Sequence, residues 1–548
     1  MRFAPTVALT DSTGAAVEQR PLTASLRPGE VSVIRLLATD NPELSPQGWQ
    51  WSAQRELTVG GVEEHTFALP FQTGASRHLS ELIAARPGGR SRTRRAVLAA
   101  TAAGIGGIAA YTALRAVDGG NGEVSALTGA DACIPPTQQL PVERAVVARF
   151  GRGWRWALSG AARTSDVGDS GRAGPDCGEP VATVVTRGDG VTYATLSSTQ
   201  VRFDTTGKYL AVRYRLNSSL KTRTLELDVS NDKDFTRFFR WQFADRADNL
   251  GSGFCYDNEW EQIFLSFADA IAYGNPDRSG ITALRLRAQD RGRPVTVQWQ
   301  DVAVVSDPGR RFPRGIATIC FDDIYETQYS HALPVLREHG FRATVAVIRQ
   351  IIDHPRAMTL AQLQSLRDLG WEIGCHANTV AVHRATDIGV PLSVLTSDLG
   401  SELAFLHANG FLGDKILAYP SGRWNPGVLK AVSRYCMAGR LDFFRTQETF
   451  PPADPYKLRA CGSISSLPGT HSAADVCGFI DAAAENRSWL ILVFHKIITG
   501  TPVQETECRL ADFREIIGHL AASRMPVMTT GEVMRLARAG RPVVEAAT

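Results

Sequence analysis

Hydrophobic and polar positions change their period along the chain. Between residues 1 and 89, short apolar stretches alternate with polar positions and are separated by Pro-Gly, Gly-Gly and Asp-Asn turns, a pattern typical of a small all-β module. Residues 143–307 keep the two-residue period in segments such as Leu210–Leu216, which predicts a β-sandwich. From residue 313 to residue 548, apolar runs alternate with helical stretches, and repeated strand-then-helix units predict a parallel sheet covered by helices. We therefore expect three folded parts, with residues 90–142 as a linker after the first.

One apolar segment interrupts this pattern. Residues 96–114 are nineteen uncharged residues that follow a cluster of five arginines, and as a helix they would span about 28 Å, close to the thickness of a bilayer's hydrocarbon core. Their high content of Ala and Gly favours insertion only weakly. The segment is interpreted as a membrane anchor, an export signal resembling the twin-arginine type, or a linker. The first two would place the following domains outside the cytoplasm.

Composition removes several classes of function. The 59 Lys and Arg residues against 56 Asp and Glu give a net charge of only +3, which argues against a nucleic-acid partner. Nine cysteines without a Cys-x-x-Cys pair fit neither a zinc ribbon nor a disulfide-dense scaffold. The layout of the second β-rich part is similar to that of jelly-roll carbohydrate-binding modules. Its largest aromatic residues would either face sugar rings or form the core: Trp241, Tyr256, Trp260 and Trp299.

Polar side chains follow the apolar runs of the last part. Asp322 and Asp323 come directly after one run, and His376 and His495 come directly after two others. Because the chemistry of parallel α/β folds collects at the carboxyl ends of the strands, we expect these groups to lie together. Two adjacent carboxylates are costly to hold side by side unless a cation compensates them or one is protonated, which is a reason to expect a metal. An imidazole would complete a mixed N/O set that suits zinc or a related divalent ion.

These motifs resemble those of the polysaccharide deacetylase family, also called the NodB homology domain. Its first motif is matched by Ile319-Cys-Phe-Asp-Asp-Ile, its third by Ala418-Tyr-Pro-Ser-Gly and its fifth by Leu490-Ile-Leu-Val-Phe-His. The resemblance covers residues from about 314 to 540 and implies a deformed (β/α) barrel. It further implies a hydrolase that removes N- or O-acetyl groups from a cell-envelope or capsular polysaccharide. The implied cofactor is a divalent metal, zinc first, with cobalt or nickel as alternatives.

The resemblance also implies a role for individual residues. Asp322 would be the general base and His495 the general acid, and Arg459 would orient the base. Asp323 and His376 would bind the metal. The oxyanion and substrate contacts would come from the third motif, at Tyr419, Pro420 and Ser421.

The second motif departs from the family pattern. The family places two metal-binding histidines four residues apart, whereas Val380 stands four residues after His376. His383, seven residues on, could supply the second imidazole, and Asn378 is a weaker substitute. If neither residue completes the site, the domain would be an inactive sugar-binding relic. The first motif also carries Ile324 where the family has Gly.

The N-terminal residues suggest a second location and function for the protein. Within residues 1–89, the run from Leu36 to Trp51 resembles the β-rich start of minor tail proteins in phages of actinobacteria. The alternative function is therefore a phage tail-associated, glycan-binding structural protein with a degenerate deacetylase domain, docked to a tail or baseplate. The first hypothesis places an exported or membrane-anchored enzyme in the cell envelope or outside the cell. The alternative places the protein in a virion tail.

Overall fold

The computed structural model divides into two compact units, residues 1–121 and 122–548. It describes the backbone of seven short strands within residues 2–67, and residues 140, 142–151, 153–164, 180–243, 254–307, 311–411, 415–442 and 446–539. Residues 96–114 lie outside the described residues, and none of the described helices is long and apolar enough to cross a bilayer.

The described strands of the first unit form two small antiparallel sheets. One sheet has the order β4-β1-β6-β7 and the other the order β3-β2-β5. Their bounds are β1 (Arg2–Pro5), β2 (Leu9–Asp11), β3 (Ala16–Val17), β4 (Leu22–Thr23), β5 (Leu44–Ser45), β6 (Trp51–Glu56) and β7 (Val62–Phe67). The resemblance of this region to phage tail proteins stays a prediction.

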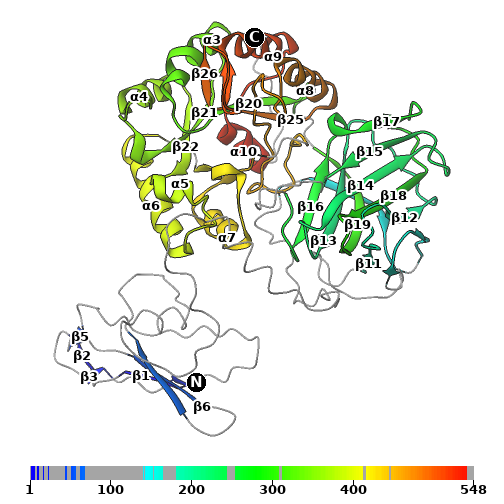
Figure 1. Ribbon diagram of the computed structural model, residues 1–548, viewed down its shortest axis with the longest axis horizontal. Helices are drawn as coiled ribbons and strands as arrows, with labels where there is room; N and C mark the ends of the chain where they lie inside the picture. The colour runs from blue at the N-terminus through cyan, green and yellow to red at the C-terminus, as the bar shows by residue number, and fades with distance from the viewer. Residues whose placement is uncertain are drawn as a thin grey trace. The chain divides into compact units, whose positions relative to one another are not determined.

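The second unit begins with two antiparallel sheets that share one core (Figure 1). The first sheet has the order β10-β11-β19-β13-β16, with β8 also paired to β19, and the second has the order β17-β15-β14-β18-β12-β9. The strands are β8 (Glu143–Arg149), β9 (Ala157–Ser159), β10 (Arg163–Thr164), β11 (Ala182–Val185), β12 (Ala194–Ser198), β13 (Tyr209–Leu216), β14 (Thr222–Ser230), β15 (Phe238–Gln242), β16 (Trp260–Leu265), β17 (Ile271–Tyr273), β18 (Ala283–Asp290) and β19 (Thr296–Ser306).

The tryptophans of these sheets belong to the core. Trp241 is fully buried, and Trp260 and Trp299 are only 6% and 1% exposed, so they cannot offer a ring face to a sugar. Large aromatic side chains remove the most apolar area from water, which is why they occupy the space between the sheets. Tyr256 is half-buried and stacks at an angle on Trp424, with ring centroids 5.7 Å apart.

The last part is built on six parallel strands. Their order is β24-β23-β22-β21-β20-β25, and each neighbouring pair is parallel. The strands are β20 (Ile316–Phe321), β21 (Thr344–Ile348), β22 (Glu372–Ala377), β23 (Ile416–Ala418), β24 (Ala438–Arg440) and β25 (Trp489–Phe494). A two-stranded sheet, β26 (Lys496–Ile498) and β27 (Glu507–Arg509), follows. The predicted parallel α/β architecture is confirmed.

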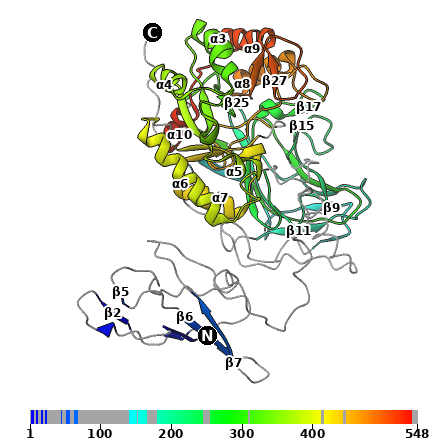
Figure 2. The same cartoon turned by 60° about the vertical axis from the view of Figure 1, so that its left-hand side comes forward.

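Helices cover this sheet, as Figures 1 and 2 show. They are α3 (Leu333–Glu338), α4 (Leu360–Asp368), α5 (Val380–Arg384), α6 (Leu392–Ala408), α7 (Pro426–Tyr435), α8 (Ala473–Asn486), α9 (Leu510–Ser523) and α10 (Thr530–Ala539). Helix α4 starts at the capping box predicted from the sequence, because Thr359 and Gln362 satisfy each other's backbone N–H groups.

A short irregular segment joins the two edges of the sheet. Leu458 forms a parallel bridge to Arg440 at the end of β24, and Cys461 forms one to Leu492 in β25. These single bridges connect the first strand of the order to the last, so the strands make a ring with one weak side. A deformed barrel, rather than a regular one, is the consequence.

The same segment contacts the antiparallel sheets through buried charges. Lys457 forms an ion pair with Glu261 of β16, and Arg459 donates from Nη2 to the backbone oxygen of Phe264. Nearby, the backbone N–H of Gln447 donates to Asp269, and burial raises the pKa of Asp269 to about 7. Because buried charges tolerate little displacement from their partners, these contacts hold the sheets against the barrel.

Candidate active site

The first motif turns sharply at the end of β20. Asp323 and Ile324 both have left-handed backbone angles, with φ of 67° and 49°, and Ile324 is fully buried. A β-branched residue in this region is strained by roughly 1–3 kcal/mol. Gln328 fixes the neighbouring strand ends, since its Nε2 donates to the backbone oxygens of Asp322 and His495. The strained turn is therefore anchored beside the end of β25.

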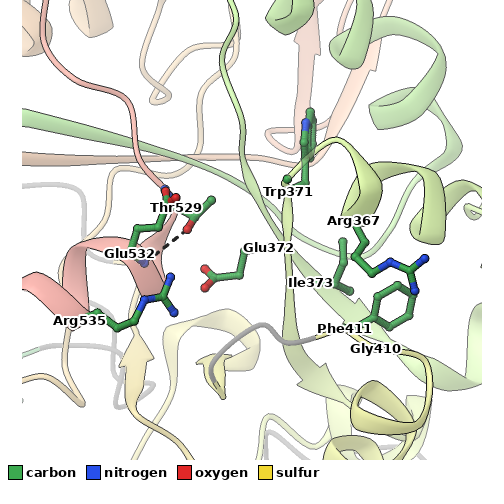
Figure 3. A pocket seen from close by; sticks show the side chains of 10 residues that line it. Arg367, Trp371, Glu372, Ile373, Gly410, Phe411, Thr529, Glu532 and Arg535 are labelled. Carbon is green, nitrogen blue, oxygen red and sulfur yellow. Dashed lines mark hydrogen bonds between the residues drawn. The ribbon is translucent and has the colours of Figure 1, made fainter. Parts of the chain in front are cut away.

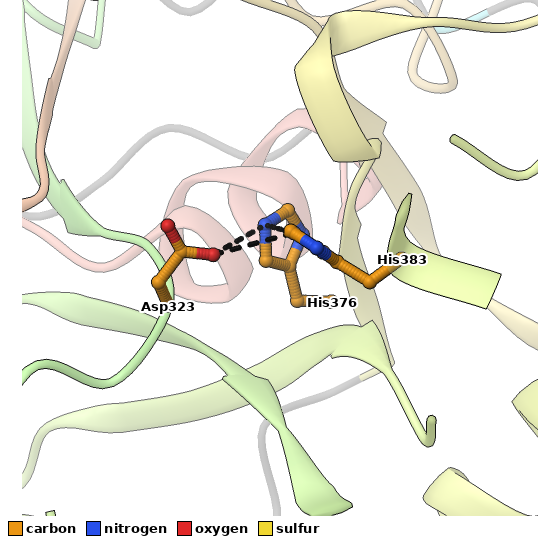
Figure 4. Close-up of side chains that lie close together, drawn as sticks. All are labelled: Asp323, His376 and His383. Carbon is orange, nitrogen blue, oxygen red and sulfur yellow. Dashed lines mark hydrogen bonds and ion pairs between the residues drawn. The ribbon is translucent and has the colours of Figure 1, made fainter. Parts of the chain in front are cut away.

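Three predicted metal ligands meet beside this turn (Figure 4). Oδ1 of Asp323 lies 3.2 Å from Nε2 of His383 and 3.5 Å from Nε2 of His376. The two imidazole nitrogens are 3.1 Å apart. The structure thus brings His383 to His376 although seven positions separate them in the chain.

The backbone fixes the orientation of the His376 ring. Its Nδ1 lies 2.8 Å from the backbone oxygen of Ala418, so we assign the Nδ1–H as donor and leave the lone pair on Nε2. The backbone N–H of His376 donates to Glu402, whose side chain is fully buried. These contacts present Nε2 to the cluster as a ligand.

Helix α5 carries His383 back to the strand end. Thr379 is its N-cap and accepts from the N–H of Val382, while the Thr379 hydroxyl donates to Asp398 of α6. The side chain of Asn378, the weaker candidate ligand, instead accepts a hydrogen bond from Arg349. The local structure therefore favours His383 over Asn378 as the third donor.

The three donors fit a tetrahedral metal site. Ligand atoms about 2.0–2.1 Å from a zinc ion in tetrahedral geometry are separated by about 3.3 Å, and the separations here are 3.1, 3.2 and 3.5 Å. Oδ1 of Asp323 is buried and receives no regular hydrogen bond within the described residues. Burial alone would raise the pKa of Asp323, but the two imidazoles hold it well below its usual range. A divalent cation bound by the two imidazoles would take the place of their protons as the positive charge beside this carboxylate.

The second carboxylate is held by an arginine. Nη2 of Arg440, at the end of β24, lies 2.6 Å from both oxygens of Asp322, and both residues are buried. Burial raises the pKa of Asp322, but the Arg440 guanidinium overcomes this and lowers the pKa. Nε2 of His495 is 4.0 Å from the same carboxylate. Asp322 is therefore held ionised, with an imidazole beside it.

The structure places Arg459 away from this carboxylate. Its guanidinium is fully buried and bonds to Glu448, Thr446 and the backbone oxygen of Phe264. The orienting contact assigned to Arg459 from the sequence is made by Arg440 instead. Arg440 ends the short run Ala438–Arg440, so the rule that chemistry follows an apolar run would have found it.

The third motif offers one exposed residue. Tyr419 is buried, and its backbone N–H donates to the backbone oxygen of Arg440. Its ring packs against Gly439, where an added Cβ would lie 2.5 Å from the phenol oxygen. Pro420 has no N–H to donate. Ser421 is exposed and has a left-handed φ of 55°, so it is the group of the three that remains available to substrate.

A separate pocket lies at the other end of the barrel (Figure 3). It has a volume of about 350 Å³ and is lined by residues of α4, the start of β22 and α10. Glu372 accepts from the N–H of Gly531 at the start of α10, and burial raises its pKa. His376 lies four residues further along β22, about 13 Å away at the strand repeat. This pocket is therefore distinct from the cluster of acids and histidines.

The fold and the site together define a class of protein. It is a parallel α/β barrel with two carboxylates and two histidines at the carboxyl ends of its strands, and a third histidine on the following helix α5. Of these groups, Asp323, His376 and His383 can hold a divalent cation. Residues 309–438 match the family model described as polysaccharide deacetylase. This part of the chain is therefore similar to the polysaccharide deacetylase family.

Curated relatives match over part of their length. The poly-β-1,6-N-acetyl-D-glucosamine N-deacetylase of Staphylococcus epidermidis is 27% identical over 160 residues, which cover 27% of this chain and 54% of that protein. The Bacillus subtilis protein YxkH, whose name assigns it to the polysaccharide deacetylases, is 28% identical over 116 residues, or 21% of this chain and 40% of that protein. The chain therefore spans about half the length of the curated relatives it matches.

The solved structures that resemble part of the chain include two named as deacetylases. The chitin deacetylase of Colletotrichum lindemuthianum is 15% identical with a TM-score of 0.29, covering 40% of this chain and 87% of that one. The deacetylase PplD of Streptococcus pyogenes is 22% identical with a TM-score of 0.22, covering 26% and 63%.

Proposed function

We propose that the chain is a metal-dependent deacetylase that hydrolyses acetyl groups on a cell-envelope or capsular polysaccharide. The observation that carries the proposal is a pair of neighbouring carboxylates with separate partners. Asp323 meets two imidazoles, whereas Asp322 meets Arg440 and His495. Both sets lie in a barrel whose residues 309–438 match the polysaccharide deacetylase model.

Asp323, His376 and His383 would hold the metal, for which zinc is the first choice and cobalt or nickel the alternatives. Such an ion supplies Lewis-acid activation of an acetyl carbonyl and of water. The hydrogen bond from His376 Nδ1 to Ala418 keeps the imidazole in the tautomer that can bind through Nε2. His383 is held by a capped helix. These features support His383 as the replacement for the histidine absent at position 380.

The chain's remaining groups account for the proton transfers. Asp322, kept ionised by Arg440, accepts a proton from the attacking water. His495 donates a proton to the departing amine or alcohol. The backbone N–H of Ser421 stabilises the oxyanion, as a preorganised donor does in other acyl-transfer sites. Arg440 acts by positioning Asp322 and does not itself contact substrate.

Polymers of N-acetylglucosamine are the substrates we propose to test first. The similar protein of Staphylococcus epidermidis is named as a deacetylase of poly-β-1,6-N-acetyl-D-glucosamine. Such polymers lie outside the cytoplasm, so the proposed location is the cell envelope or the exterior.

Acetate release tests the function. The purified full chain should release acetate from N-acetylchitohexaose, peptidoglycan or acetylated xylan, and chelation of metal should abolish the release. Asp322→Asn should lower the rate by about 10²- to 10⁴-fold, the usual contribution of a general base. Asp368→Asn, at a side chain that is 67% exposed, is the matched control and should keep the rate. No acetate from any of the three polymers, or full activity in Asp322→Asn, would overturn the proposal.

A further inference from the structure

One face of the β17-β15-β14-β18-β12 sheet carries an unusual row of side chains. Residues directly opposite each other across antiparallel strands lie on the same face of the sheet. The pairings Ile271–Arg240, Arg240–Asp228, Asp228–Arg285 and Arg285–Ser197 cross five adjacent strands. At about 4.8 Å per strand, the row is about 19 Å long.

This face points away from the shared core. Leu225, Leu227 and Val229 of β14 are fully buried and alternate with the residues of the row, so the row lies on the outer face. The barrel contacts the other sheet, since Ala453 packs on Ala211 and Phe264. Figure 1 shows β13 and β16 nearer to the barrel than β12 and β18.

Carboxylates lie beneath arginines on this outer face. The side chains of Glu226 and Asp228 have no exposed area. Asp228 accepts from Arg240 and Arg285, and Glu226 accepts from Arg287 at 2.6 Å. The three arginines are themselves only 16–23% exposed. The guanidinium planes are therefore fixed in place, and each of these hydrogen-bond sets uses only part of the five donors that a guanidinium has.

Aromatic rings alternate with the fixed arginines. Arg285 lies 4.2 Å from the ring centre of Phe235, Arg240 lies 5.5 Å from that of Tyr273, and Arg287 lies 3.6 Å from that of Tyr193. Tyr273 is stacked on Phe238 at 4.6 Å, and it is 39% exposed. The outer face thus presents planar apolar surfaces next to oriented N–H donors.

A strained turn contributes one of these rings. Phe235 has a left-handed φ of 55°, which is rare for a bulky residue. The carboxylate of Asp232 stabilises the turn by accepting from the N–H groups of Asp234, Thr236 and Arg237. Backbone strain of this kind persists where surrounding contacts enforce it, and it is found at ligand-binding sites.

We propose that this aromatic-arginine face binds a second stretch of the polysaccharide whose acetyl groups the barrel removes. The face consists of Tyr193, Phe235, Tyr273, Arg240, Arg285 and Arg287. Sugar rings have apolar C–H faces that pack on aromatic rings, and their hydroxyl and acetamido oxygens accept hydrogen bonds from guanidinium groups. The inference rests on the proposed function, since it takes the polymer to be the barrel's substrate.

The charge of the face favours an uncharged polymer. Its three arginines and two buried carboxylates leave a net charge of only +1, so the guanidinium groups act mainly as oriented hydrogen-bond donors. The proposed occupant follows from the neighbouring barrel, which resembles polysaccharide deacetylases over residues 309–438. The buried ion pair Lys457–Glu261 and the hydrogen bond from Arg459 to the backbone oxygen of Phe264 hold the sheets against this barrel. Two sites in one compact unit raise the effective concentration of polymer at the barrel.

Binding of a long polymer tests the inference. All binding would be measured in the full chain carrying Asp322→Asn, so that substrate is not consumed. The probes are insoluble chitin, purified peptidoglycan and poly-β-1,6-N-acetylglucosamine. The parent should bind at least one of these probes. The double variant Phe235→Ala/Tyr273→Ala should bind that probe at least about tenfold more weakly. Arg285→Lys, which keeps the charge but loses the planar group, should also weaken binding.

Tyr435→Ala is the matched control, because Tyr435 is 37% exposed on α7 of the barrel, and it should bind like the parent. The inference is overturned if the parent binds none of the three probes, or if the double variant binds as the parent does. Acetate release from N,N′-diacetylchitobiose is measured in chains with Asp322 intact. It separates failure of the proposed binding face from failure of the proposed deacetylase function. The double variant should keep that activity, since the short substrate does not reach the face. If the double variant loses polymer binding but the parent with Asp322 intact releases no acetate, the deacetylase function is overturned and the binding face is supported.

Discussion

Replacing Arg440 by Met tests whether this guanidinium, rather than that of Arg459, controls Asp322. Two hydrogen bonds of 2.6 Å join Nη2 of Arg440 to the carboxylate of Asp322, and the side chains are only 3% and 8% exposed. Removing one partner of such a buried pair costs about 3–5 kcal/mol of folding free energy. Urea denaturation of Arg440→Met should show a loss of this size.

Arg440→Met should also lower kcat/KM of the protein that remains folded. A misplaced general base forfeits about 10²-fold in kcat/KM, or about 2.7 kcal/mol. Burial raises the pKa of Asp322 and Arg440 lowers it, so removing the guanidinium should raise that pKa. The acidic limb of the kcat/KM profile should therefore move to higher pH. Arg440→Lys keeps the charge but loses the planar donor group, and it should lie between the parent and Arg440→Met.

Arg459→Met is the control because Arg459 is equally buried but bonds to Glu448 and Phe264. It should lose a similar amount of stability and keep kcat/KM in the folded fraction, with an unchanged pH profile. If Arg440→Met stayed within threefold of the parent across the pH range, or if Arg459→Met lost as much activity, Arg440 would not be the positioning residue.

Further predictions concern the metal, the strained turn and the domain contact. His383→Ala should retain at least about tenfold less zinc after dialysis, measured by plasma mass spectrometry, and the exposed His354→Ala should retain it; equal zinc in both would remove His383 from the site. Ile324→Gly should be about 1 kcal/mol more stable to urea than Ile324→Ala, because the φ of 49° disfavours any Cβ; the reverse order would refute strain at this turn. Burial raises the pKa of Asp269 to about 7, so the folded chain holds a proton that the unfolded chain releases near pH 4. Stability should then fall as pH rises from about 4 to about 7, by up to about 1.4 kcal/mol per unit, and a chain with Asp269→Asn that kept this slope would contradict the assignment.

The sequence predicts the carboxyl ends of the strands well, because each apolar run ends at a recognisable polar residue. Asp322, Asp323, His376 and His495 follow such runs, and the structure brings all four to one end of the barrel. The position of His383 could not be decided from spacing alone. It depends on the short helix α5 and on the contact between Thr379 and α6.

The structure places Arg459 away from Asp322. The end of the run Ala438–Arg440 marks Arg440 as a candidate, but the ring closure that brings it to Asp322 is not visible in the sequence. Arg440 and Asp322 are 118 residues apart, and their contact depends on how the irregular segment 458–461 joins the sheet edges. The tryptophans show a second limit of the sequence, which is that residue size does not tell which face of a strand a side chain occupies. The size of Trp241 makes it a candidate for sugar binding, yet it lies one position from Arg240 in β15 and therefore on the opposite, inner face.

The segment that closes the barrel also couples the antiparallel sheets to it, so the two parts should evolve together. Leu458 and Cys461 bridge the edge strands, while Lys457 and Arg459, beside and between them, place their charges against β16. Exchange of the antiparallel sheets for another module would leave the buried charge of Lys457 without Glu261 and weaken the side of the ring that the segment closes. We therefore expect the sheets and the barrel, which share one compact unit, to be inherited together.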